Sequence, residues 1–105
     1  MRIWLSFDLG VSGDYEGMYQ WLDDKDAQEC GATVASFLCS EEHDLLPSLR
    51  SEIEEAVTLN KRSRVYVVYK DDEGKGKGRF LIGGRKRAPW DGYGTHEEPD
   101  DDEDL

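Results

Sequence analysis

The chain has 105 residues, a formal net charge of −11 and 37% hydrophobic residues. This length fits one small domain, or one domain with a tail, that can fold without metals or disulfides. No apolar run approaches the roughly 20 residues that a membrane-spanning helix needs, and the first residues lack a secretion-signal pattern. The composition excludes a membrane protein, a collagen, a repeat array and a disulfide-stapled miniprotein, and we expect a cytoplasmic protein.

The first half of the chain predicts a strand, a helix and a second strand. Residues 2–9 alternate around apolar side chains, which predicts a strand buried largely on both faces. Asp14 is a good N-cap for a helix that runs to about Asp24. The helix has one apolar stripe because its apolar residues are spaced by three and four positions. Residues 33–39 then predict a second strand with apolar side chains on both faces.

The second half predicts another helix and a hairpin. Residues 40–44 form a polar turn, and a helix begins near Asp44, with Pro47 tolerated in its first turn. The β-branched and aromatic run 65–69 predicts the clearest strand of the chain, and residues 79–82 predict a shorter one. The glycine-rich stretch between these two strands joins them as a hairpin.

The predicted order is therefore β-α-β-α-β-β, an α/β domain over residues 1–94 followed by a disordered acidic tail over residues 95–105. The β-α-β units imply right-handed parallel crossovers, and the final hairpin adds an antiparallel strand. We expect a two-layer, ferredoxin-like sandwich with a four-stranded mixed sheet covered by two helices. The strand order cannot be read from the sequence.

Cys30 and Cys39 are expected to be reduced. They lie nine positions apart, and at ~3.3 Å per residue along an extended chain their separation exceeds the reach of a disulfide. They are either small buried hydrophobic residues or reactive thiols. Neither has a neighbouring basic residue that would activate it, and no zinc-ligand spacing is present.

Charge is segregated along the chain. Residues 1–60 carry three Lys/Arg against thirteen Asp/Glu, residues 61–90 carry ten Lys/Arg against three, and residues 91–105 carry eight Asp/Glu without a base. A dense carboxylate surface attracts basic partners and can imitate a phosphate backbone. The basic segment can instead contact phosphates, or the two poles can serve solubility.

The function that we expect first is that of a non-catalytic, acidic interaction module, of the inhibitor, immunity or antitoxin type, that binds a basic surface of a partner protein. Trp21 would supply anchor area. The carboxylates expected to match the partner's charge are Asp23, Asp24, Asp26, Glu29, Glu52, Glu54 and Glu55.

The alternative function is nucleic-acid binding, with or without Mg²⁺-dependent RNA cleavage. Tyr66, Tyr69 and Phe80 offer stacking faces, and the acidic tail would compete with nucleic acid. The cations expected to contact phosphates are Lys75, Lys77, Arg79, Arg85, Lys86 and Arg87.

Asp8 is the best catalytic candidate, because it ends the first strand and precedes a glycine. With Asp14 it could hold Mg²⁺ for phosphodiester chemistry. The structural alternative is that Asp8 caps its own turn and Asp14 caps the helix. Trp90 and Tyr93 either form an exposed binding patch or close over the end of the core.

The strand end Phe7-Asp8 and the later strand 64–69, with aromatics near its end, resemble a family of small ferredoxin-like proteins. The family includes virulence-associated protein D endoribonucleases and the small CRISPR-associated spacer-adaptation subunit. The resemblance implies a ferredoxin-like sheet, a homodimer and Mg²⁺ at Asp8. The chain departs from the family pattern in its one predicted strand between the helices, its basic hairpin and its acidic tail.

Overall fold

The computed structural model describes residues 1–40 and 44–94. Most of the predicted turn at 40–44 and the whole predicted tail at 95–105 lie outside these residues. These described residues form two helices and five strands. In chain order they are β1 (Arg2–Asp8), α1 (Tyr15–Asp24), β2 (Gln28–Gly31), β3 (Val34–Leu38), α2 (Leu45–Ala56), β4 (Arg64–Lys70) and β5 (Gly76–Ile82).

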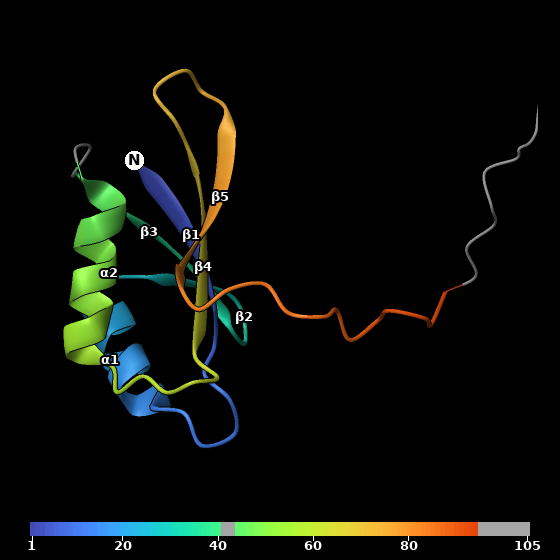
Figure 1. The fold of residues 1–105 in the computed structure, drawn as a ribbon. Coiled ribbons are helices and arrows are strands. Elements are labelled where there is room, and N and C mark those ends of the chain that lie inside the picture. The colour runs from blue at the N-terminus through green and yellow to red at the C-terminus, as the bar shows by residue number, and fades with distance from the viewer. Residues whose placement is uncertain (41–43, 95–105) are drawn as a thin grey trace, which may run out of the picture.

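The five strands form one antiparallel sheet in the order β2-β3-β1-β4-β5. Both helices lie against the same face of this sheet, which leaves the other face open (Figure 1). The expectation of a four-stranded mixed sheet was therefore wrong. The strands predicted at 2–9 and 33–39 correspond to β1 and β3, which pair in antiparallel sense, so the predicted parallel crossover between them was wrong. β3 lies between β1 and β2 and is antiparallel to both.

The strand that the sequence did not predict is β2. Its residues 28–31 are exposed or half-buried, so they carry no alternation of apolar and polar side chains. The segment is a strand because its backbone pairs with β3 across a tight turn, with Gln28 opposite Ser36 and Glu29 opposite Ala35. Side-chain pattern is the main sequence signal for a strand, and here the backbone pairing alone specifies it.

Burial in β1 alternates. Ile3, Leu5 and Phe7 are buried beneath the helices, whereas Trp4 and Ser6 point to the open face. The prediction of a strand buried on both faces was wrong, because no layer covers the second face. Trp4 is 38% exposed there. An antiparallel sheet with one solvated face has this pattern.

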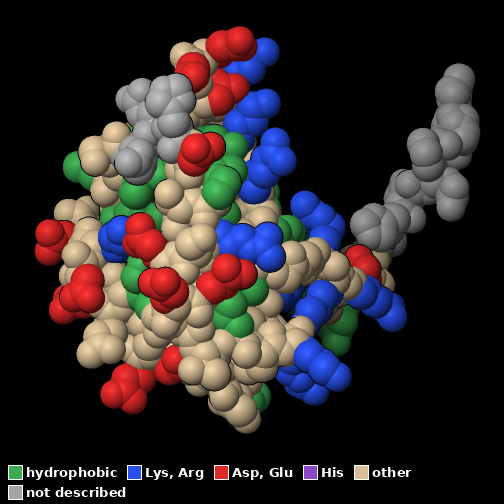
Figure 2. Space-filling view, turned by 60° about the vertical axis from the view of Figure 1, so that its left-hand side comes forward, with side chains coloured by type: hydrophobic (Ala, Val, Ile, Leu, Met, Phe, Trp, Pro, Cys, Tyr) green, Lys and Arg blue, Asp and Glu red, His purple; other side chains and the backbone are tan. Residues whose placement is uncertain are grey.

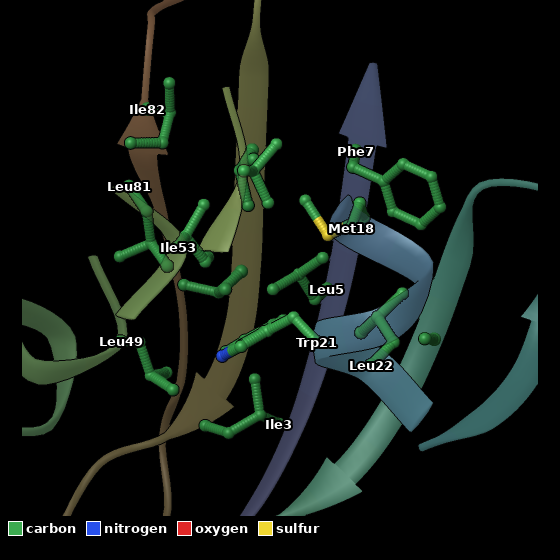
Figure 3. Close-up of a cluster of buried hydrophobic side chains, with 14 of the residues drawn as sticks. Ile3, Leu5, Phe7, Met18, Trp21, Leu22, Leu49, Ile53, Leu81 and Ile82 are labelled. Carbon is green, nitrogen blue, oxygen red and sulfur yellow. The ribbon is translucent and has the colours of Figure 1, made fainter. Parts of the chain in front are cut away.

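The hydrophobic core fills the space between the helices and the sheet, where the helix side chains meet those of β1, β4 and β5 (Figure 3). Met18, Trp21 and Leu22 of α1 pack there, and Trp21 stacks edge-on against Phe37 with ring centroids 5.6 Å apart. From α2, Leu45, Leu49 and Ile53 complete this layer.

Asp14 caps α1, as the structural alternative for this residue predicted. One carboxylate oxygen accepts the Gly17 N–H at 2.9 Å, and the other accepts the Thr58 N–H at 2.8 Å, just beyond α2. These hydrogen bonds hold the pKa of Asp14 below its ordinary value. One side chain thus joins the start of the first helix to the end of the second.

The β4–β5 hairpin is longer than predicted, because β5 begins at Gly76. Its turn is closed by Asp71, whose Oδ1 accepts the N–H groups of Glu73 and Lys75, both at 2.9 Å. Glycines at positions 76 and 78 hid the strand, since glycine weakens the sequence signal for β structure.

Cys30 and Cys39 form no disulfide, as predicted. Cys30 is exposed and Cys39 is half-buried, so the alternative of two small buried hydrophobic residues was wrong for Cys30. Among the described residues, no helix has the length and apolarity needed to cross a membrane.

Candidate nucleic-acid interface

The open face of the sheet carries a hollow of about 330 Å³. Its lining comes from three adjacent elements, β1, β4 and β5, and from the segment that follows β5. Because side chains alternate along each strand, residues two positions apart meet on this face. The lining residues are Ser6, Asp8, Arg64, Tyr66, Phe80 and Arg85.

Asp8 and Arg64 form an ion pair at one end of this hollow. They lie opposite each other on β1 and β4, and Arg64 Nη2 donates to Asp8 Oδ2 at 3.0 Å. Asp8 Oδ1 accepts the Gly10 N–H at 3.2 Å, which is the turn-capping role given above as the structural alternative. The Arg64 hydrogen bond, followed by that from Gly10, holds the pKa of Asp8 below its ordinary value. Asp8 is therefore an anion at neutral pH.

Arg64 keeps hydrogen-bonding capacity. Its Nε is buried and has no hydrogen-bond partner within residues 1–40 and 44–94. A guanidinium has five N–H donors in a planar fork that suits phosphate and carboxylate oxygens. Arg64 and Arg85 are the two cations that line the hollow, and the Nη2 group of Arg64 is paired with Asp8.

Tyr66 and Phe80 form the aromatic wall of the hollow. They are cross-strand neighbours on β4 and β5, with ring centroids 4.8 Å apart at 67°. The Arg85 guanidinium lies 5.9 Å from the centroid of the Phe80 ring, within cation–π range. Both aromatics are half-buried, which leaves ring surface available to a ligand.

The open face continues from the hollow toward the start of β1. Trp4 lies opposite Val68, which is 41% exposed, and Leu38 near the same end is 66% exposed. Arg2 Nη1 donates to Ser36 Oγ at 2.8 Å, which holds this cation over the sheet. The face therefore combines aromatic and apolar surface with Arg2 and Arg64.

The structure places only some of the predicted stacking and phosphate-binding residues in the hollow. Tyr66, Phe80 and Arg85 lie together, but Tyr69 packs against the core on the helix side of the sheet. Lys77 and Arg79 pair with Tyr69 and Val67, so they also lie on the helix side. Lys75 lies at the hairpin turn, and Lys86 and Arg87 are exposed after β5.

The predicted carboxylates lie on the opposite layer of the molecule, on or next to the helices. Figure 2 shows acidic side chains over this side and basic ones toward the hairpin and the segment after β5. Trp21, expected to anchor a partner, is only 6% exposed and its Nε1 donates to Glu52 Oε1 at 3.0 Å. The carboxylates that remain exposed are Asp23, Asp24, Asp26, Glu29, Glu54 and Glu55.

Two of the predicted carboxylates, Glu52 and Glu54, form ion pairs within the molecule. Glu52 also pairs with Lys25 at 2.6 Å, and Glu54 pairs with Arg50 at 3.2 Å. Burial raises the pKa of Glu52, but hydrogen bonds from Lys25 and Trp21 outweigh it and lower that pKa overall.

Asp8 and Asp14, the pair predicted to hold Mg²⁺, make different contacts in the structure. Asp8 lines the hollow, whereas Asp14 uses both oxygens to join the helices. Within the part of the chain that the structure describes, no group of three or more His, Cys, Asp or Glu side chains is placed to hold a metal ion.

Comparison with protein-family models, curated proteins and solved structures finds no match to this chain. A function for this site is therefore inferred from its own geometry. Sequence reasoning missed Ser6, Arg64, Trp4 and Arg2 as members of this face. The signal was present in β1, where every second residue from Arg2 to Asp8 is polar or amphipathic.

Proposed function

We propose that the protein binds single-stranded nucleic acid on the open face of its sheet. The observation that carries this proposal is the hollow where the Tyr66 and Phe80 rings lie beside Arg64 and Arg85. Aromatic side chains on a sheet stack unpaired bases, and guanidinium groups contact phosphates. Unpaired bases are required because a duplex keeps its base faces covered.

The charges of the described residues are compatible with this proposal, because the predicted carboxylates and the cations of the hollow lie on different layers. The predicted carboxylates lie on or next to the helices, and an α-helix with its side chains is about 10–12 Å across. At physiological salt the Debye length is about 8 Å. A phosphate on the open face is therefore screened from the outer acidic surface, while it remains close to Arg64 and Arg85.

We also propose that the fold is ferredoxin-like, with β5 added at one edge. The order β1-α1-β2-β3-α2-β4 and the sheet order support this assignment. The structure has two strands between the helices, whereas the sequence alone predicted one. Two strands at this place agree with the resemblance to the virulence-associated protein D family. RNA cleavage by that family is the reason to test the bound nucleic acid for degradation.

The test is the affinity for a labelled 12-nucleotide RNA and the matching DNA, measured by fluorescence anisotropy at 50 mM salt. Stacking contributes about 1–3 kcal/mol per base, so Phe80→Ala should weaken binding at least about fivefold. Arg85→Ala should weaken it and reduce the salt dependence. Undetectable binding of both oligonucleotides, even after removal of residues 95–105, would contradict the proposal.

Two variants control for nonspecific effects. Tyr19→Ala removes an aromatic that is 54% exposed on α1, and Arg50→Ala removes a cation paired with Glu54 on α2. Both lie in the helix layer and should leave the affinity unchanged. Circular dichroism and urea unfolding establish that each variant is folded.

A second candidate function rests on the acidic layer itself. Asp23, Asp24, Asp26, Glu29 and Glu55 are exposed and form no ion pair among the described residues. Such a surface suits a basic protein partner, as in an inhibitor or a nucleic-acid mimic. Charge reversal by Asp24→Lys with Glu55→Lys should abolish capture of that partner in pull-down, whereas Phe80→Ala should not.

A further inference from the structure

We infer that residues 84–94, here called the arm, form a second contact region for the same single-stranded nucleic acid, so that a bound strand runs from the open face of the sheet onto the arm. This inference rests on the proposed function and extends the site beyond the hollow. It names Trp90 and Tyr93 as base-stacking residues and Arg85, Lys86 and Arg87 as phosphate contacts.

The arm starts where the chain turns out of the sheet. Gly83, directly after β5, has a φ of +72°, and a Cβ there would lie 2.6 Å from the Ser63 carbonyl oxygen. Only glycine satisfies both conditions without strain. The turn directs the following residues away from the helix layer, on the side of the open face (Figure 1).

The arm exposes large aromatic surface. Trp90 is 73% exposed and Tyr93 is 88% exposed, so the alternative that they close over the core is wrong. Two short turns hold them, since the Asp91 N–H donates to the Ala88 carbonyl at 3.1 Å and the Tyr93 N–H to the Trp90 carbonyl at 3.0 Å. Exposed aromatics that are ordered locally and uncovered by the fold are typical of binding surfaces.

The charge of the arm indicates a polyanionic partner. The arm carries three adjacent cations and one carboxylate, Asp91, whose Oδ2 lies 3.8 Å from Arg87 Nε. A basic surface combined with exposed aromatics is typical of single-strand binding proteins. An apolar or basic partner would not match this charge, whereas a polyanion with flat bases would.

The arm is also continuous with the hollow. Arg85 belongs to both, because its guanidinium lies over Phe80 while its backbone begins the arm. Lys86 is close enough to Asp8 to help lower the pKa of that carboxylate. A sheet with exposed aromatics holds about two or three bases, so a longer strand that leaves the hollow past Arg85 next meets the arm.

The test compares a tetranucleotide with a 12-nucleotide strand, as oligo(U) and oligo(dT), in anisotropy titrations of the whole chain. The variant Trp90→Ala with Tyr93→Ala removes exposed side chains and should not alter folding. We expect at least about a fivefold loss of affinity for the 12-mer and an unchanged affinity for the tetranucleotide. Trp90→Phe with Tyr93→Phe should restore 12-mer binding, and Tyr19→Ala on α1 should leave it intact.

The outcomes separate this inference from the proposed function. A wild type that binds the 12-mer no better than the double alanine variant would overturn the arm and leave the sheet site standing. A wild type that binds neither the tetranucleotide nor the 12-mer would contradict both the arm inference and the proposed function. Equal loss at both lengths would place Trp90 and Tyr93 at the hollow instead. If the double variant only abolishes self-association in sedimentation, the arm docks on the acidic layer of a second copy and the inference is wrong. The RNA and DNA series identify which sugar is preferred.

Discussion

Asp8→Asn distinguishes a phosphate-binding site from a site of RNA cleavage. The variant should bind RNA more tightly if the hollow binds phosphates, and it should lose RNA degradation if Asp8 is catalytic. Asp8 Oδ2 accepts from Arg64 Nη2 at 3.0 Å and neutralises one of the two cations that line the hollow. Asparagine is isosteric, can still accept the Gly10 N–H, and carries no charge. If the hollow binds phosphates through Arg64, the variant gains the equivalent of one phosphate contact.

The size of the gain follows from counterion release. For a single strand, each phosphate contact contributes about 0.7 to the slope of log affinity against log salt, which corresponds to about a fivefold tighter complex at 0.1 M salt. The advantage of the variant should shrink by about 2.6-fold between 50 and 200 mM salt. Stability should change little. The Asp8 side chain is 58% exposed, and exposed ion pairs contribute about 0–1 kcal/mol.

The assay is the anisotropy titration with the 12-nucleotide RNA, repeated at four salt concentrations, with product analysis on a denaturing gel. Weaker binding by Asp8→Asn at every salt concentration would refute the phosphate-binding role of Arg64. Mg²⁺-dependent degradation by the wild type that Asp8→Asn abolishes would show Asp8 to be catalytic. Arg50→Ala is the matched control for a charge change on the helix layer, outside the lining of the hollow.

Two further predictions concern the helix layer. Gly17→Ala should destabilise the fold by about 1–3 kcal/mol in urea unfolding, although alanine favours helices, because its Cβ would contact the Asp14 carboxylate and lie 2.6 Å from the Ala56 carbonyl oxygen; a stabilised variant would contradict this. The folded-state pKa of Glu52 lies below its ordinary value of 4.5, so its charged form stabilises the fold above pH 4.5 and this contribution is lost as the pH falls through the folded-state value. The wild type should therefore have the higher urea midpoint than Glu52→Gln at pH 7, and this advantage should shrink as the pH falls below 4.5; a constant difference would show that the charge plays no part.

The sequence predicted those elements whose side chains repeat with a clear period. α1 and α2 were found because their buried residues recur every three or four positions and Asp14 begins the first of them. β4 was found because it is β-branched and aromatic throughout. Each of these segments has a local signal that tertiary packing does not override.

The sequence did not predict β2, the antiparallel sheet or the grouping of the hollow's residues, because these depend on pairing between separate segments of the chain. β2 has exposed side chains and exists through its backbone bonds to β3, so no side-chain pattern marks it. Missing β2 changed the inferred sheet from antiparallel to mixed. The site was affected in the same way. Arg64 and Asp8 are 56 positions apart, and only the register of β1 against β4 brings them together. Phe80 and Tyr69 looked equivalent in sequence, but their strand positions send them to opposite faces.

The separation of charge between the two layers has a consequence for how binding depends on salt. At 0.01 M salt the Debye length is about 30 Å, longer than the helix layer is thick, so a strand on the open face is repelled by the carboxylates beyond it. At 0.1 M the length is about 10 Å, and that repulsion is screened while the direct contacts to Arg64 and Arg85 persist. We therefore expect the plot of log affinity against log salt to flatten below about 50 mM instead of rising in a straight line. Glu54→Gln with Glu55→Gln removes two exposed charges from α2 and should steepen the low-salt part alone. A plot that is linear for the wild type, or one that the double variant shifts equally at all salt concentrations, would show that the acidic layer and the open face do not act as separate poles.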